Sequence, residues 1–135
     1  MKDTLRAAAV QAEDELPALE IPITRTLIVV GALASRDFQD VHHDAETVRA
    51  SGAKDIFMNI LTTNGIVGRF VTDWAGPEAL IKKVSIRLGV PNYPDDVMKL
   101  TGRVVSVDGS SVAVEIRGTN SLGDHVTGTV SVELP

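Results

Sequence analysis

The stretch from residue 37 to residue 44 concentrates side chains that can exchange protons. It contains three aspartates and two of the three histidines in the chain. Asp37 and His42 are five residues apart, so one loop can bring both to the same water molecule. A carboxylate and an imidazole, which exchanges protons near neutral pH, are suited to general acid and base chemistry. We therefore predict a catalytic site here, although spacing alone also fits a polar loop with an Asx turn at Asp37 and a surface imidazole at His42.

The polar residues next to this pair have simpler expected roles. Asp44 precedes a short helix predicted over residues 45–50 and is suited to cap its N-terminus. His43 is expected to face solvent, because side chains of neighbouring residues diverge from one another. The same divergence argues against a metal site, since His125 is the only other imidazole and the chain has no cysteine. We expect no metal.

Length and composition limit the possible classes of protein. The chain has 135 residues, enough for one domain with its own core, and we predict an N-terminal arm over residues 1–15 and a single domain over residues 16–135. The net charge is -5 and the basic residues are scattered, so nucleic acid is not an expected partner. The first residues contain no long apolar stretch, and we expect neither a signal peptide nor membrane association, and a cytoplasmic location.

The pattern of apolar residues predicts strands before and after a helical region. Residues 24–34 are almost entirely apolar, which predicts a strand that is buried on both faces. Later segments alternate between apolar and polar residues, a pattern typical of strands with one face in the core and one in water. These further strands are predicted at residues 79–89, 97–107, 111–119 and 125–134.

Between the predicted strands at residues 24–34 and 79–89, residues 55–71 show the periodicity of a helix. Asp55 is the candidate N-cap, and the helix is expected to end near residues 73–77. Only one charged residue interrupts the apolar pattern, so this helix must be covered on nearly all sides. Gly65 and Gly68 are unfavourable in a helix interior and predict that a neighbour, plausibly a sheet, packs closely there.

Together these elements predict an α+β fold, with a curved antiparallel sheet wrapped around a long central helix. One layer of five or six strands leaves part of such a helix uncovered. We therefore expect a second copy of the chain or a partner to cover the rest.

Several motifs resemble one known family. The pattern Asp37-x-x-x-x-His42-x-Asp44, followed by a short helix, resembles the hydratase motif of the MaoC-like (R)-specific enoyl-CoA hydratases, which have a hot-dog fold. Residues 87–96 look like the strand and turn that follow in this family. Within it, residues 35–44, 54–57, 72–77 and 122–126 are similar to the small catalytic subunits of actinobacterial steroid (cholesterol) side-chain hydratases. Two departures are Gln39-Asp40 in place of Asn-Pro and Ile56-Phe57 in place of His-Gly.

The resemblance implies an enzyme, an enoyl-CoA hydratase subunit that adds water to a trans-2-enoyl-CoA to give a 3-hydroxyacyl-CoA. It implies that Asp37 and His42 are the catalytic residues, with the roles of acid and base left open. Backbone amides near Ile56 to Met58, at the expected start of the central helix, are placed to hold the thioester oxygen, so Phe57 and Met58 are predicted to bind substrate. CoA is part of the substrate and no separate cofactor is expected. The implied partner is a second MaoC-like subunit in a hetero-oligomer.

Two alternatives stay open at the level of sequence. One is a homodimeric (R)-specific hydratase for fatty enoyl-CoA, and the other is a non-catalytic hot-dog module that binds acyl-CoA. The second is disfavoured by the presence of both Asp37 and His42, which a binding module does not need.

Overall fold

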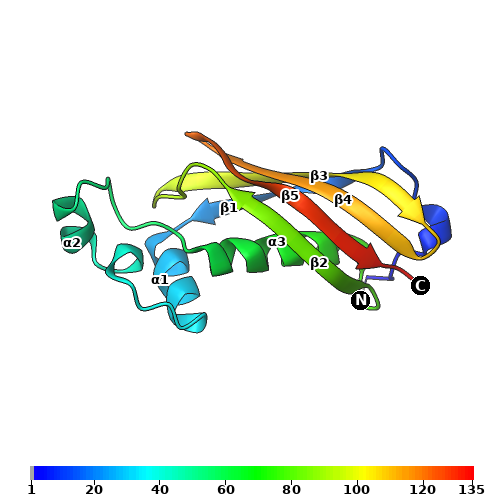
Figure 1. Cartoon of the computed structure of the whole chain (residues 1–135), viewed down its shortest axis with the longest axis horizontal. Helices are drawn as coiled ribbons and strands as arrows, with labels where there is room; N and C mark the ends of the chain where they lie inside the picture. The colour runs from blue at the N-terminus through cyan, green and yellow to red at the C-terminus, as the bar shows by residue number, and fades with distance from the viewer. Residues whose placement is uncertain (1) are drawn as a thin grey trace.

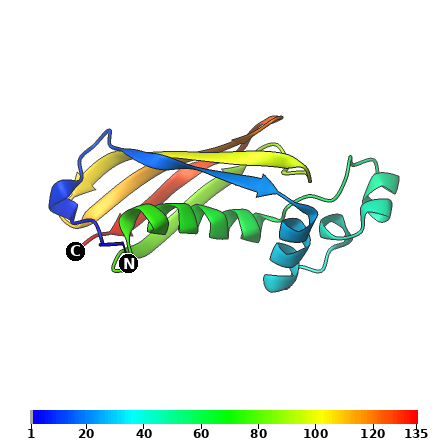
Figure 2. The same ribbon diagram turned by 180° about the vertical axis from the view of Figure 1, so that it is seen from behind.

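A five-stranded antiparallel sheet and one long helix form the body of the molecule (Figure 1). The computed structural model describes residues 2–135. The strands follow the order β1-β3-β4-β5-β2, and α3 (Ile60–Ala75) runs along one face of the sheet, as Figure 2 shows from behind. The predicted arrangement of a curved antiparallel sheet and a central helix is confirmed. The strand bounds are β1 (Glu15–Ile23), β2 (Leu80–Leu88), β3 (Asp96–Asp108), β4 (Ser111–Asn120) and β5 (Gly123–Glu133).

The four strands predicted after the helix all form, within one or two residues of the expected bounds. Their alternation sorts the side chains as expected. In β4, Val112, Val114 and Ile116 are buried in the core, while Glu115 and Arg117 on the opposite face are exposed. Each buried aliphatic side chain of this kind stabilises the fold by about 1.5–3 kcal/mol. The sheet face that they form is the one that α3 covers.

The predicted strand over residues 24–34 is wrong, because this segment is the helix α1 (Arg25–Ala34). The hydroxyl of Thr24 accepts a hydrogen bond from the Leu27 amide at 3.0 Å and caps the helix. Ile28 and Ala32, four residues apart, form its buried side. In a short segment that is apolar at every position, periodicity does not distinguish a helix from a strand. The N-cap residue is then the feature that favours the helix. The strand lies earlier, in β1, which pairs with β3.

The central helix begins five residues later than predicted. Asn59, and not Asp55, is its N-cap, since the Asn59 side chain accepts a hydrogen bond from the Thr62 amide. Residues 55–59 are an extended segment that leads into the helix. The C-terminal end is as expected, because Gly76 takes a positive φ of 101° directly after Ala75.

One side of α3 is open in this chain. Its buried side consists of Thr63, Ile66, Val67, Phe70, Val71 and Ala75. Gly65 and Gly68 lie on the other side, where an added Cβ would meet nothing within 4 Å, so the prediction that a sheet packs on them is wrong for the chain by itself. The sheet covers only half of the helix, and Ile60 and Leu61 in its first turn are exposed.

The remaining segments connect to this body at its two ends. At one end, the 3-10 turn η2 (Asp40–His42) and the short helix α2 (Ala45–Ala50) follow α1, and Asp44 caps α2 as predicted. At the other end, residues 2–14 include the 3-10 turn η1 (Ala7–Ala9) and are tied to the body through the Leu5 amide, which donates to the Ala75 carbonyl at 2.8 Å. Met1 of the predicted arm lies outside the described residues, and the division at residue 16 stays a prediction. Within residues 2–135, no helix has the length and apolar character needed to cross a membrane.

The close crossing of α1 and α3 at Gly31 gives a first prediction. A Cβ at Gly31 would overlap the hydroxyl of Thr62 and come within 2.9 Å of its methyl group. Gly31→Ala should therefore lower the free energy of unfolding by about 1–3 kcal/mol, through overpacking. Gly65→Ala is the matched control. Its added methyl group meets nothing, so it should raise helix stability by about 0.5–1 kcal/mol. Urea unfolding of both variants tests this, and equal effects of the two would contradict the assignment of Gly31 as a contact point.

Candidate active site

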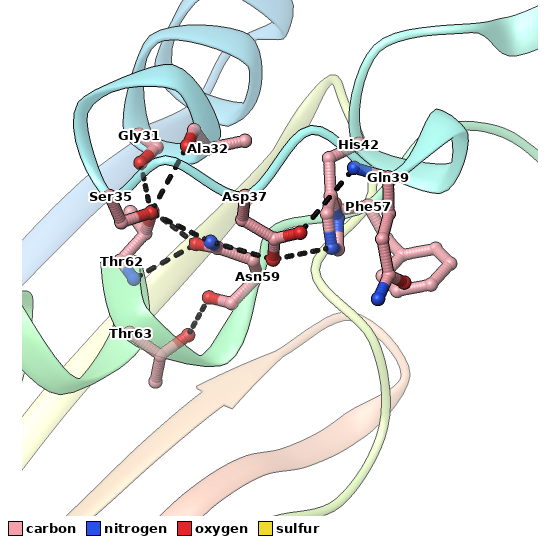
Figure 3. A network of polar contacts seen from close by, with 10 residues as sticks. All are labelled: Gly31, Ala32, Ser35, Asp37, Gln39, His42, Phe57, Asn59, Thr62 and Thr63. Atoms are coloured by element: carbon pink, nitrogen blue, oxygen red, sulfur yellow. Dashed lines mark hydrogen bonds and ion pairs between the residues drawn. The ribbon is translucent and has the colours of Figure 1, made fainter.

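The structure brings Asp37 and His42 into direct contact. Oδ2 of Asp37 lies 3.2 Å from Nε2 of His42, in the segment between α1 and α2 (Figure 3). The chain leaves α1 through Arg36, which takes a positive φ of 57°, and the Asp37 amide then donates to the Ala32 carbonyl at 2.9 Å. This turn directs the carboxylate towards the η2 segment that carries His42. The predicted pairing of these two side chains is therefore present.

His42 is buried and its ring is held from two sides. Nδ1 lies 2.7 Å from the Phe57 carbonyl oxygen, and a carbonyl can only accept, so Nδ1 carries a proton. The Phe57 amide donates to the Val41 carbonyl at 3.1 Å. The Phe57 ring meets the His42 ring edge to face, with the two centroids 5.2 Å apart. Phe57 thus fixes both the tautomer and the plane of His42. Nε2 is the ring atom left for chemistry.

The carboxylate of Asp37 is held in its ionised form. The Asn59 carboxamide donates to Oδ2 at 3.1 Å, and this hydrogen bond is the main cause of a pKa of Asp37 below its usual value, with the Gln39 amide and His42 adding to it. Nε2 of His42, the ring nitrogen that is not bonded to Phe57, faces Oδ2 of this carboxylate at 3.2 Å.

A pocket of about 440 Å³ opens beside this pair. Its walls come from residues 57–60, from the segment after β2 and from the start of β5. The lining residues are Asp37, Gln39, His42, Phe57, Met58, Asn59, Ile60, Leu88, Gly89, Val90, Pro91, Tyr93 and His125. Most of these residues are apolar or contribute backbone atoms to the wall. Asp37 and His42, the two polar side chains in contact with each other, lie together at one place in it. This is a common design of a small-molecule site.

The prediction that the amides of Ile56 to Met58 are free to hold a substrate oxygen is wrong. The Ile56 amide donates to Oδ1 of Asp55 at 2.8 Å, that of Phe57 to Val41, and that of Met58 to the Asn92 carbonyl at 3.1 Å. These residues are extended and precede the helix. Within residues 2–135, the amides of the next three residues, 59–61, have no acceptor. Phe57 and Met58 do line the pocket, and their contact with substrate stays a prediction.

Asn59 and the buried pair of Thr63 and His125 also belong to the site and were not predicted from the sequence. Nδ1 of His125 donates to the Val90 carbonyl at 2.6 Å, so Nε2 accepts from the Thr63 hydroxyl at 2.8 Å. Burial lowers the pKa of His125, which keeps it neutral. Asn59 was recognisable as a residue type preferred at the N-cap, directly before the apolar Ile60 and Leu61. His43 is exposed and 3.7 Å from Asp40, and so faces away from the pair as expected.

A buried carboxylate anchors the segment that carries Phe57 and Asn59. Arg25 of α1 binds Asp55 through both oxygens, at 2.9 and 2.6 Å, and Arg49 of α2 adds a contact of 3.0 Å. Arg25 foremost, with the Ile56 amide and Arg49, holds the pKa of Asp55 well below its usual range. The two arginines therefore join both helices to the start of residues 55–59.

This arrangement predicts an acid-dependent loss of stability. The pKa of Asp55 is lower in the folded than in the unfolded chain, so its contribution is complete above the unfolded value of about 4 and falls as the pH drops below it. Asp55→Asn should destabilise the chain at pH 7, and the gap between variant and wild type should narrow in acid. Asp73→Asn, which removes an exposed pair with Arg69, should have a smaller effect at every pH. Urea unfolding across this pH range measures both, and a gap that stays constant in acid would contradict the anchoring role.

Comparison with known proteins identifies similar chains. The 3-oxo-4,17-pregnadiene-20-carboxyl-CoA hydratase beta subunit of Mycobacterium tuberculosis is 53% identical over 119 residues, which cover 88% of this chain and 92% of that protein. The crystal structure of the ChsH1-ChsH2 complex from the same organism contains a chain that is 51% identical with a TM-score of 0.90, covering 92% of this chain and 98% of that one.

A more distant match is the (R)-hydratase from A. caviae involved in PHA biosynthesis. It has a TM-score of 0.86 at 15% identity, covering 94% of this chain and 98% of that one, which shows a shared fold. The predicted hot-dog fold is thereby confirmed. No family model matches the sequence.

Proposed function

The chain belongs to the MaoC-like hydratase family, and on that premise we propose that it is the catalytic subunit of an enoyl-CoA hydratase. The observation that carries the proposal is the contact of 3.2 Å between the ionised Asp37 and Nε2 of His42 beside a pocket. The reaction adds water across the double bond of a trans-2-enoyl-CoA and gives a 3-hydroxyacyl-CoA. It requires a base for the water and an acid for the α-carbon.

The hydrogen bonds of the pair support a division of these roles. Oδ2 of Asp37 is occupied by Asn59 and His42, whereas Oδ1 receives only a long contact of 3.4 Å from the Gln39 amide among the described residues. Oδ1 is therefore the oxygen that takes a proton from the attacking water, while the water oxygen forms a bond to the β-carbon. The electrons of the double bond move towards the thioester carbonyl.

His42 then completes the addition. Protonation of Asp37 weakens its hold on the Nε2 hydrogen, and His42 donates this hydrogen to the α-carbon. The proposal has His42 protonated on both ring nitrogens before the reaction. Asp37 is left as a carboxylic acid with its proton on Oδ1, and His42 is left as a neutral imidazole. Asp37 then releases this proton to water in the pocket while Nε2 takes one up from water, which restores the starting pair, so the net reaction consumes one water molecule and no other reactant. The base is Asp37 and the acid is His42 in this proposal.

The first turn of α3 supplies the second requirement, stabilisation of the thioester oxygen as it gains charge. Asn59 and Ile60 line the pocket, and their backbone amides are not bonded within residues 2–135. Amides at a helix N-terminus point along the axis and favour negative charge. Placed there, the thioester directs its acyl chain past Phe57 and Met58, which are the substrate-binding residues of the proposal. CoA is part of the substrate and the proposal includes no cofactor.

The proposed substrate carries a steroid-derived acyl group, and the proposed partner is a second MaoC-like subunit. The relative that is 53% identical has a steroid CoA ester in its name and is a beta subunit, and the similar crystal structure is of a complex of two proteins. In this chain, the exposed Phe38, Ile60 and Leu61 adjoin site residues and offer apolar surface for a bulky group or for the partner. The proposal includes a cytoplasmic location.

Substitution of the catalytic pair tests the chemistry. Asp37→Asn and His42→Ala should each lower kcat/KM for the steroid enoyl-CoA by about 10²–10⁴-fold, because each removes a proton-transfer group. Asp40→Asn and His43→Ala are matched controls. They change the same residue types in the same segment, at an exposed pair 3.7 Å apart, and should leave activity nearly unchanged. Hydration is followed by the loss of enoyl thioester absorbance. Wild-type activity in His42→Ala would rule out the proposed site.

Substrate and partner are tested in the same assay. The purified chain is measured alone and after co-expression with a candidate MaoC-like subunit, on steroid and on straight-chain enoyl-CoA. We expect full activity only for the pair and only on the steroid ester. Full activity of the chain alone on straight-chain esters would instead support the homodimeric hydratase. Binding without turnover in either preparation would support the non-catalytic module.

A further inference from the structure

The side chain of Asn59 touches both the catalytic carboxylate and the central helix. It is 2% exposed, and all its hydrogen-bonding groups are used. Nδ2 donates to Oδ2 of Asp37 at 3.1 Å and to Oγ of Ser35 at 2.9 Å. Oδ1 accepts from the Thr62 amide at 2.9 Å and from the Thr62 hydroxyl at 2.6 Å (Figure 3).

The surroundings of Asn59 allow only one orientation of its carboxamide. A backbone amide can only donate, so the atom next to the Thr62 amide must be the oxygen. Nδ2 therefore faces Asp37 and Ser35. The Ser35 hydroxyl is itself committed, since it donates to the Gly31 carbonyl at 2.7 Å and so accepts from Asn59. A carboxamide turned by 180° would place its oxygen against the carboxylate and its hydrogens against the Thr62 amide. Each hydrogen bond between the end of α1, Asn59 and Asp37 therefore has a fixed donor and a fixed acceptor.

From this geometry we propose that Asn59 is a positioning residue for the hydration reaction: it holds Oδ2 of Asp37 against His42 and thereby leaves Oδ1 to receive the proton of water. The inference rests on the proposed function. Without the donor at Nδ2, the carboxylate can rotate and exchange its two oxygens. The turn at Arg36 sets the backbone position of Asp37, but only Asn59 and His42 bind Oδ2 among the described residues.

Asn59 also fixes the distance between Asp37, the proposed base, and the backbone amides that are proposed to bind the thioester oxygen. Its oxygen caps α3 in the turn whose residues Asn59 and Ile60 line the pocket. Its nitrogen holds the base. The position of the water relative to the thioester is therefore set by one planar group with no freedom to turn. A misplacement of about 1 Å between reacting groups can lower a rate about 10²-fold.

Asn59→Asp separates this role from helix capping. Aspartate caps a helix as well as asparagine does, so the cap of α3 is kept and only the contacts of Nδ2 change. The variant removes the donor to Asp37 and places a second carboxylate against it, and two carboxylates at hydrogen-bond distance cannot both ionise freely. The pair at positions 37 and 59 should then bind a proton above about pH 4, where wild-type Asp37 is already ionised. The NMR signals of labelled Asp carboxyl carbons in the full chain, without substrate, report this uptake.

The kinetic result follows from the same change. With its partner subunit, Asn59→Asp should lose about 10²-fold in kcat/KM at neutral pH. The acid limb of its pH profile should move to higher pH. Gln11→Glu is the control, because Gln11 is exposed at the other end of the molecule and the substitution adds the same charge. It should keep the wild-type profile. Asn59→Ala loses the cap as well and should lower the melting temperature by about 4 °C.

Two outcomes would overturn the inference. One is an Asp37 carboxyl signal that titrates alike in wild type and Asn59→Asp. The other is wild-type kcat/KM at neutral pH in Asn59→Asp, with the acid limb of the pH profile unmoved. The titration needs no substrate and therefore decides the inference even if the chain hydrates no enoyl-CoA, a result that would refute the proposed function alone.

Discussion

The hydrogen bond from Nδ1 of His42 to the Phe57 carbonyl is the interaction on which the site depends. It assigns a proton to Nδ1, so the other nitrogen is the only one that can meet Asp37. In the proposed mechanism this nitrogen donates a proton and Asp37 accepts one, so acid and base are separate groups. A rotated His42 ring, or the other tautomer, would remove that asymmetry. The acceptor is a backbone atom in an extended segment, held in place by the Phe57 amide and by Asp55 with its two arginines.

The fold separates the chemistry from the rest of the core. The helices α1 and α2 and the start of α3 lie together at one end of the sheet, while both chain termini lie at the other (Figure 1). The core between the sheet and α3 is filled mostly with aliphatic side chains. The site forms where the sheet no longer covers the helix. The same geometry leaves one side of α3 and its apolar first turn open, which is why the proposal includes a second subunit.

Sequence alone predicted most of the sheet, because Val112, Val114 and Ile116 alternate with polar residues and no other structure fits that period. It also identified Asp37 and His42, through the family resemblance more than through spacing. Prediction from the sequence was wrong where the residues of a segment fit two different structures. Residues 24–34 are apolar at every position and carry no period, and Asp55 looks like a cap but is bound by two arginines from distant helices. The occupation of the amides at 56–58 depends on Val41 and Asn92, which are partners that no local pattern reveals.

The cap of α3 also has a consequence for motion. Helix ends are ordinarily the first parts of a fold to open, since their terminal groups lack partners and exchange with water. Here the terminal turn is closed by a side chain that is 2% exposed and is bound to a neighbouring helix as well. Because the same side chain binds Oδ2 of Asp37, displacing Asn59 to open this turn also releases the base. Local opening of the first turn of α3 and the loss of the catalytic arrangement at Asp37 are therefore thermodynamically linked.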